Sequence, residues 1–201
     1  MNFDVTHLQE VAHFQEVAYF QEVAYFQEVA YFQEVDKKGS RLEMASLEPR
    51  YQAYLQQYLD TLPPDAPQRT APTDACQFGD FPALADELGG LIVSGTKTAT
   101  CGAVCAYEAE GSPLPTAGLL TVVLAGNNEP LCVIETTEAV IRPFKEVDAQ
   151  FAYEEGEDDR SLASWRHEHW KFFSRVLPRD YGLEPTEDMP LVCERFRVVY
   201  P

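Results

Sequence analysis

The chain has 201 residues, and its 15 lysines and arginines against 33 aspartates and glutamates give a formal net charge of −18 and a pI of about 4.4. Apolar residues make up 45% of the sequence and aromatic residues 12%, which excludes extensive disorder and predicts one folded domain with an appendage. The acidic excess argues against a protein that grips long nucleic acids, because each phosphate contact normally needs a lysine or arginine.

Residues 1–43 form a segment dominated by a tandem repeat. The unit Gln-Glu-Val-Ala-Tyr-Phe begins at Gln9 and starts again, with little variation, at Gln15, Gln21, Gln27 and Gln33. A six-residue period gathers no single apolar face on a helix or a strand. Abundant alanine, glutamate and glutamine without glycine or proline favour a helix. We therefore expect a helical or disordered repeat arm.

Two interpretations of this arm remain open. It is either a recent tandem expansion without a dedicated function or a self-association arm, because exposed phenylalanine and tyrosine rings favour partners. Met44 opens a sequence of ordinary complexity, so a native start at this residue is an alternative.

Residues 44–75 are predicted to contain a helix and a proline-rich linker. Apolar side chains recur at helical spacing at Tyr51, Tyr54, Leu55, Tyr58 and Leu59. Prolines then predict a loop over residues 62–72.

A second helix is marked by its terminal residues. Asp80 is a candidate cap, Pro82 suits the first turn, and Gly95 follows the last apolar residues. This helix leads directly into the run Gly95-Thr96-Lys97-Thr98-Ala99-Thr100.

The second half of the chain alternates between strand and helix patterns. Residues 119–125, 130–140 and 191–200 are predicted strands, and Gly126-Asn127-Asn128 is a predicted hairpin turn. A helix is expected to begin at Leu162, after Asp158 and Asp159, and to end at Pro178. Short strands with helices between them predict an α+β domain, with a small curved sheet or barrel and helices packed on its side.

The sequence also limits location and cofactors. No window approaches the ~18 continuous apolar residues of a membrane span, and a signal-peptide pattern is absent, so we expect a cytoplasmic protein without a membrane partner. The five cysteines are scattered, and Cys101 and Cys105 have no second pair at zinc spacing. We expect neither a metal site nor a cofactor.

Lys97 and Thr100 are the first candidates for chemistry. They lie three residues apart, just after Gly95. In a dry pocket, burial lowers the pKa of a lysine and lets it act as a base toward a neighbouring hydroxyl. The competing interpretation is a solvated loop lysine, which is the common case.

The acidic stretch from Glu154 to Asp159 also has two interpretations. In one, it is a solvated loop whose last carboxylates cap the Leu162 helix. In the other, one glutamate turns inward, pairs with Lys97 and takes part in proton transfer. Trp165 and His169 are expected on the apolar face of that helix, where core packing is their usual role.

Several ordered stretches together resemble the ASCH domain family, a branch of the PUA-like β-barrel proteins. The resemblance covers residues 78–200 and includes Phe78-Gly79-Asp80, Ser94-Gly95-Thr96-Lys97-Thr98-Ala99-Thr100, Phe151-Ala152-Tyr153-Glu154-Glu155-Gly156-Glu157, Arg160-Ser161-Leu162-Ala163-Ser164-Trp165-Arg166 and Val192-Cys193-Glu194-Arg195-Phe196. We therefore identify residues 76–201 as an ASCH domain, with a PUA-like small β-barrel and flanking helices as its expected fold.

The resemblance implies a cleft beside the Gly95-Thr96-Lys97 loop. Some small bacterial members are amidohydrolases that remove the acetyl group of N4-acetylcytidine with a lysine, a threonine and a glutamate. These roles fall on Lys97, Thr100 and Glu155, with Glu157 as the alternative glutamate.

Ligand contacts are expected from residues in and around this cleft. The candidates are Gly95, Thr98 and Trp165. Arg142 is a further candidate, because the family commonly places an arginine five residues after the lysine, where this chain has Gly102. Arg142, Lys145 and Arg166 are the possible replacements for that arginine. The expected ligands are a nucleoside, a nucleotide or a short RNA.

The resemblance leaves the activity open. The most concrete expectation is amide hydrolysis on N4-acylated cytidine, and the alternatives are a non-catalytic RNA-binding module and a ribonuclease. Acidic residues occur throughout the chain, in the domain as well as in the arm. This charge favours a small ligand around Lys97 over a long RNA.

Overall fold

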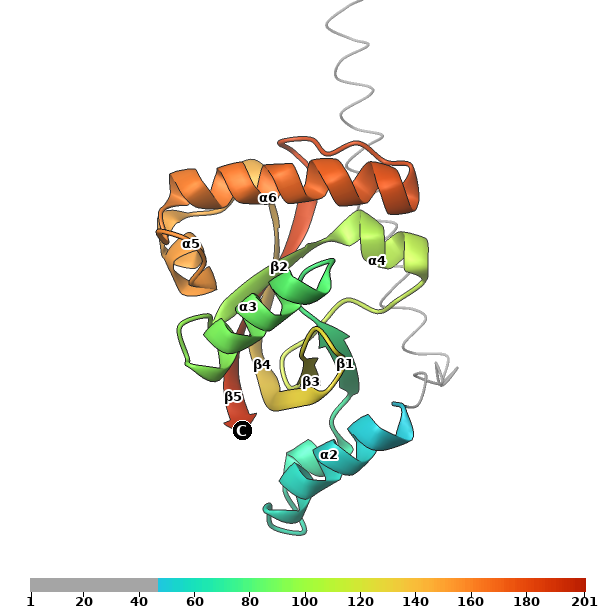
Figure 1. Ribbon diagram of the computed structural model, residues 1–201. Coiled ribbons are helices and arrows are strands. Elements are labelled where there is room, and N and C mark those ends of the chain that lie inside the picture. The colour runs from blue at the N-terminus through green and yellow to red at the C-terminus, as the bar shows by residue number, and fades with distance from the viewer. Residues whose placement is uncertain (1–46) are drawn as a thin grey trace, which may run out of the picture. The chain divides into compact units, whose positions relative to one another are not determined.

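The computed structural model describes residues 47–201, which contain five strands and several helices (Figure 1). The elements are α2 (Pro49–Asp60), η1 (Pro67–Thr70), β1 (Thr73–Gln77), α3 (Pro82–Val93), β2 (Ala99–Ala103), α4 (Val104–Glu110), β3 (Leu120–Leu124), β4 (Pro130–Pro143), η2 (Phe144–Glu146), α5 (Ala149–Glu155), α6 (Leu162–Val176), η3 (Leu177–Tyr181) and β5 (Pro190–Tyr200). The predicted arm over residues 1–43 and the proposed start at Met44 lie outside the described residues.

The strands form one sheet in the order β1-β3-β4-β5-β2. β1 runs parallel to β3, and all other pairs are antiparallel. The register of the long strands β4 and β5 shifts at Val133/Ile134 and again at Thr136/Glu138, and such bulges increase the local bend of a sheet. The result is a curled half-barrel in which β1 and β2 are the edges, in agreement with the expected small curved sheet or barrel. The predicted α+β class is confirmed.

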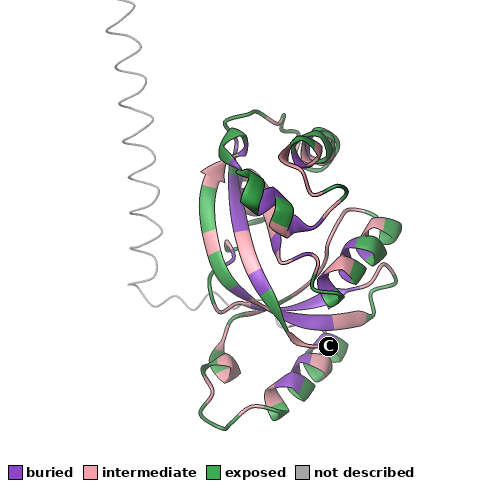
Figure 2. Ribbon diagram, turned by 90° about the vertical axis from the view of Figure 1, so that its left-hand side faces the viewer, coloured by how far each residue is buried: buried purple, intermediate pink, exposed green. Residues whose placement is uncertain are grey.

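α2 covers one face of this sheet. Its buried residues Tyr51, Leu55 and Tyr58 pack against Leu120 and Val122 of β3. Figure 2 colours the ribbon of this helix partly as buried and partly as exposed. The helix predicted from the spacing of these side chains is therefore confirmed, and burial of its apolar side is what stabilises it on the sheet.

α3 covers the opposite face, where Ile92 packs with Val123 of β3 and Phe196 of β5. Pro82 lies in the first turn as predicted, but the cap expected from Asp80 is wrong, because the helix begins after Phe81 without a side-chain cap. Asp80 instead accepts hydrogen bonds from two arginines, at 2.7 Å from Arg175 in the last turn of α6 and at 3.1 Å from Arg179 in η3. Two guanidinium groups are stronger partners for a carboxylate than backbone amides.

α5 and α6 complete a third apolar cluster against β2, which includes Ala99, Phe151, Trp165, Phe173 and Leu177. The cap of α6 is Ser161, whose Oγ accepts a hydrogen bond from the amide of Ser164 at 3.1 Å. The expected caps Asp158 and Asp159 are therefore wrong. Asp159 instead holds the preceding turn through the amide of Ser161.

The helical backbone does not end at Pro178, as was expected, although α6 itself ends at Val176. The backbone continues into the π-helical turn Leu177–Tyr181, which ends at the left-handed Gly182. Among residues 47–201, none of the helices has the length and apolar character needed to cross a bilayer.

Candidate functional site

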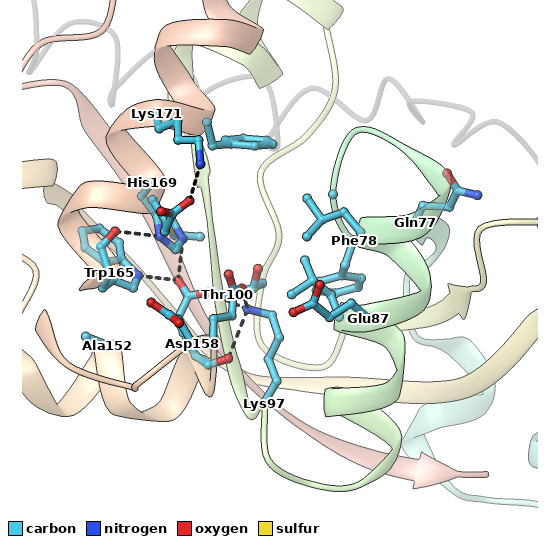
Figure 3. Close-up of a pocket in the computed structure, with 18 of the residues that line it drawn as sticks. Gln77, Phe78, Glu87, Lys97, Thr100, Ala152, Asp158, Trp165, His169 and Lys171 are labelled. Atoms are coloured by element: carbon cyan, nitrogen blue, oxygen red, sulfur yellow. Dashed lines mark hydrogen bonds and ion pairs between the residues drawn. The ribbon is translucent and has the colours of Figure 1, made fainter. Parts of the chain in front are cut away.

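A cleft of about 530 Å³ opens between the α3 region and α6 (Figure 3). Phe78 and Leu84 line the α3 side, and Trp165 and Phe172 line the α6 side. Strands β2 and β5 supply the polar residues Thr100 and Glu194. Its size is typical of a small-molecule site, and its lining combines aromatic and aliphatic side chains with many charged ones.

Lys97 reaches this cleft because of the turn that follows α3. Gly95 has a φ of 74°, a conformation that strains any residue with a side chain. The amides of Gly95 and Lys97 donate to the carbonyl oxygens of Ile92 and Leu91 at 2.9 and 3.0 Å. The turn is therefore fixed by its own backbone, and it directs Lys97 inward, where only 1% of the residue is exposed.

Two carboxylates hold the Lys97 ammonium. Nζ lies 2.5 Å from Oε2 of Glu155 and 2.6 Å from Oε1 of Glu157, and it also faces the Glu155 carbonyl oxygen at 3.4 Å. The Glu155 side chain is 1% exposed, whereas that of Glu157 is 27% exposed. A buried lysine with two carboxylates is costly to desolvate, so this cluster is weak evidence for stability and stronger evidence for a functional site.

Gly156 separates the two glutamates at the end of α5. It has a φ of 75°, and a Cβ at this position would lie 2.4 Å from the carbonyl oxygen of Thr96. The amide of Thr98 also donates to the Glu154 carbonyl at 2.8 Å. The end of α5 is therefore in direct backbone contact with the lysine turn.

The second carboxylate oxygen of Glu155 is held by α6. The indole Nε1–H of Trp165 donates to Oε1 at 3.1 Å, and Nε2 of His169 lies 3.5 Å from the same atom. His169 Nδ1 lies 3.0 Å from the Trp165 carbonyl oxygen, and the two rings stack with centroids 4.2 Å apart. Trp165 and His169 therefore orient Glu155 toward Lys97.

These contacts fix the charges of the cluster. Burial alone would lower the pKa of Lys97, but the charges of Glu155 and Glu157 outweigh it and raise this pKa above its ordinary value. Burial likewise opposes ionisation of Glu155, yet Lys97 and His169 hold the pKa of its carboxyl below its usual range. The pKa of Lys97 therefore moves in the direction opposite to that expected from burial, and its resting form is the ammonium.

Thr100 lies beside Glu194 on the floor of the cleft. The two residues are directly paired between β2 and β5. Burial raises the pKa of the Glu194 carboxyl to about 7, the negative charge of Asp74 adds to this effect, and a hydrogen bond from Thr136 opposes it. One cleft thus contains a carboxylate fixed in its charged form and a carboxyl that titrates near neutrality.

Comparison with known proteins assigns the family. Residues 74–200 match the model of the ASCH domain. The chain belongs to the ASCH domain family. It is similar to the crystal structure of an ASCH domain from Lactobacillus crispatus, at 36% identity and a TM-score of 0.73, over 80% of this chain and 100% of that one. A protein from Enterococcus faecalis is 37% identical at a TM-score of 0.63, over 74% of this chain and 87% of that one. Curated proteins give no match.

The ASCH domain brings only some of the predicted site residues together. Lys97, Thr100, Glu155, Glu157 and Trp165 all line the cleft. The predicted ligand residues Gly95, Thr98 and Arg142 are not among the residues that line it. Arg142 instead pairs with Asp148 at 3.2 Å, and the Thr98 hydroxyl donates to the Glu154 carbonyl at 3.3 Å.

The side chain of Tyr107 occupies the space beside Gly102, where the resemblance leads one to expect an arginine. A Cβ on Gly102 would lie 2.9 Å from Cε2 of Tyr107, which itself lines the cleft. Tyr107 therefore fills the space next to this position with a neutral, half-buried ring.

Glu194 and Tyr107 were not predicted as cleft residues, and His169 was expected in the core, whereas it lies against Glu155. Glu194 stands in a strand of alternating apolar and charged residues, a pattern that normally places charges in solvent. The one available signal was its place between the apolar Val192 and Phe196, each two residues away and therefore on the same face of the strand.

One group of side chains in the described residues has the composition of a metal site. Ligand atoms of Cys101, Glu155 and His169 lie within 4.8 Å of one another. Burial raises the pKa of the Cys101 thiol well above its ordinary value, and metals bind the thiolate. Glu155 is already bound to Lys97, so the donor set does not fit a resident metal ion.

Proposed function

We propose that this ASCH domain binds a nucleoside, or a nucleoside exposed in a short RNA, and hydrolyses the amide of N4-acylated cytidine. The observation that carries this proposal is the buried Lys97 between Glu155 and Glu157, at the base of a cleft with aromatic walls. Aromatic side chains stack on bases, and the charged cluster lies where an acyl group could be polarised.

The charges in the cleft favour a ligand without phosphate. The three lysines and arginines among its described lining residues are already engaged: Lys97 with two glutamates, Lys171 with Glu168, and Arg175 with Asp80. A phosphate would have to displace one of these carboxylates. An uncharged base and ribose would not, which supports a small ligand within a family that is suggested to bind RNA.

In the proposed reaction, the Thr100 hydroxyl attacks the acyl carbon. The Lys97 ammonium stabilises the negative charge that develops on the acyl oxygen. Lys97 could remove the Thr100 proton only after its own proton had moved to Glu155 or Glu157 along the hydrogen bonds of 2.5 and 2.6 Å. In that route one glutamate shuttles the proton.

The test is to incubate the full chain with N4-acetylcytidine and to measure cytidine and acetate. We expect turnover by the wild type and a loss of at least ~100-fold in Thr100→Val. Thr137→Val is the matched control, because the Thr137 hydroxyl binds the Arg195 carbonyl outside the cleft. This control should retain the wild-type rate.

The alternatives give different results in the same experiment. Nucleoside binding by calorimetry without any turnover would support a non-catalytic binding module. Cleavage of unmodified RNA that disappears in Lys97→Ala would support a ribonuclease. Equal turnover in Thr100→Val and wild type would contradict the nucleophile assigned here.

A further inference from the structure

One carboxyl group of the cleft lies outside the Lys97 cluster. Glu194 of β5 is directly opposite Thr100 of β2 in an antiparallel pair, and both residues line the cleft. Directly opposed side chains project from the same face of a sheet, with Cβ atoms about 4.5–5.5 Å apart. The pairing therefore makes Glu194 and Thr100 neighbours on one face of the sheet, with both side chains in the cleft lining.

The surroundings of Glu194 differ from those of Glu155. Its Oε2 accepts a hydrogen bond from the Thr136 hydroxyl at 3.0 Å. The titratable groups that interact with it are Asp74 and Cys76 from β1 and Tyr107 from α4, and none of these carries a positive charge. Nothing in this set holds Glu194 in its ionised form in the way that Lys97 holds Glu155.

The two carboxyls are therefore suited to different tasks. The pKa of Glu155 is held below its usual range, while that of Glu194 is raised to about 7. Where one active site contains carboxyls shifted apart in this way, the ionised one supplies a fixed charge and the other exchanges protons. A group that titrates near the working pH is also the more effective acid–base catalyst.

We propose that Glu194 is the proton-transfer residue of the cleft, which accepts the Thr100 proton and delivers it to the departing nitrogen. This inference rests on the proposed amide hydrolysis. Lys97 needs no change of protonation in this route, because its ammonium acts only through its charge.

The steps of this route balance as follows. Thr100 Oγ forms a bond to the acyl carbon while its proton moves to the Glu194 carboxylate. The carbon–nitrogen bond then breaks, and the proton passes from Glu194 to the nitrogen of the released cytidine. Water attacks the resulting ester, gives a proton to Glu194, and Glu194 returns it to Thr100 Oγ as the carboxylic acid leaves.

The test is the pH dependence of kcat/KM for N4-acetylcytidine in the full chain. The plot of kcat/KM against pH for the wild type should show an ionisation limb, that is, a pH-dependent change in rate, near pH 7. Glu194→Gln should lower kcat/KM by at least ~100-fold and abolish the limb. Thr136→Val should move the limb to higher pH, because it removes the hydrogen bond that favours the ionised carboxyl. A merely structural role of Glu194 would not move a limb.

Exposed Glu129 provides the matched control, since Glu129→Gln makes the same change outside the cleft and should leave both rate and limb unaltered. If the wild type is active and Glu194→Gln keeps both the rate and the limb, the role of Glu194 is wrong and the hydrolysis stands. If the wild type shows no turnover at any pH, the proposed function fails, and this role fails with it. Thermal unfolding of each variant verifies that it is folded.

Discussion

Gly156 lies so close to the backbone of Thr96 that a Cβ at position 156 would be 2.4 Å from the Thr96 carbonyl oxygen. This contact joins the end of α5 to the turn that carries Lys97. Because Glu155 and Glu157 flank Gly156, the contact also sets the position of both carboxylates around the ammonium.

The contact predicts a large cost for Gly156→Ala. Gly182 is a matched control, because its φ is also positive, at 67°, but nothing lies within 4 Å of a Cβ there. Gly182→Ala should cost about 1–2 kcal/mol of unfolding free energy for the left-handed backbone. Gly156→Ala should cost at least ~3 kcal/mol, because the clash with Thr96 adds to this strain. Urea denaturation measures both, and equal losses would contradict the tight contact.

Removal of the Lys97 charge should destabilise the domain. Lys97→Met leaves Glu155 buried without its cation, and loss of one partner of a buried ion pair costs about 3–5 kcal/mol. The double variant Lys97→Met/Glu155→Gln should recover part of this loss, since no buried charge then remains at position 155. Lys145→Met breaks an exposed pair with Asp188 and should not shift the urea midpoint. An unchanged midpoint in Lys97→Met would refute the buried pair.

Trp165 has a polar role in addition to packing. Trp165→Phe keeps an aromatic ring next to Phe144 but removes the Nε1–H that binds Glu155 at 3.1 Å. A hydrogen bond to a charged group contributes about 1.5–3 kcal/mol, so we expect a loss of this size in denaturation. Trp170→Phe, at a ring that is 37% exposed and makes no contact with Glu155 or the cleft, should be nearly neutral. Similar losses in both variants would assign Trp165 to packing alone.

The raised pKa of Glu194 predicts how stability changes with pH. Between its ordinary value of 4.5 and about 7, the folded chain holds the Glu194 proton more tightly than the unfolded chain does. The contribution of Glu194 to the unfolding free energy therefore falls as pH rises through this window, by ~1.4 kcal/mol for each unit of pKa difference. Glu194→Gln should remove the fall and make the domain more stable than wild type at pH 8. A parallel pH profile in both proteins would show that the carboxyl is not raised.

The repeat arm yields a separate prediction from the sequence. If its aromatic side chains cause self-association, deletion of residues 1–43 should lower the sedimentation coefficient beyond the change expected from mass alone. Sedimentation velocity at several concentrations measures this. Concentration-independent monomers of the full chain would end the self-association hypothesis.

Much of the secondary structure followed from local patterns. α2, α3 and α6 bury apolar residues at helical spacing, and β3, β4 and β5 are rich in β-branched residues. Periodicity therefore located the helices, and composition located the strands. β1 and β2 were not predicted, because each has only five residues of weak strand propensity. They form strands through pairing with β3 and β5, which are distant in sequence.

The sequence by itself determined the fold class, the ASCH family and the pairing of Lys97 with an inward-facing glutamate as one of two alternatives. Tertiary structure decided which carboxylates surround Lys97, in which direction its pKa moves, and that Arg142 lies away from the cleft. It also brought Glu194 next to Thr100. The reason is physical: the charge state of a group depends on burial and on neighbours a few ångströms away, which are contributed by segments far apart in the chain.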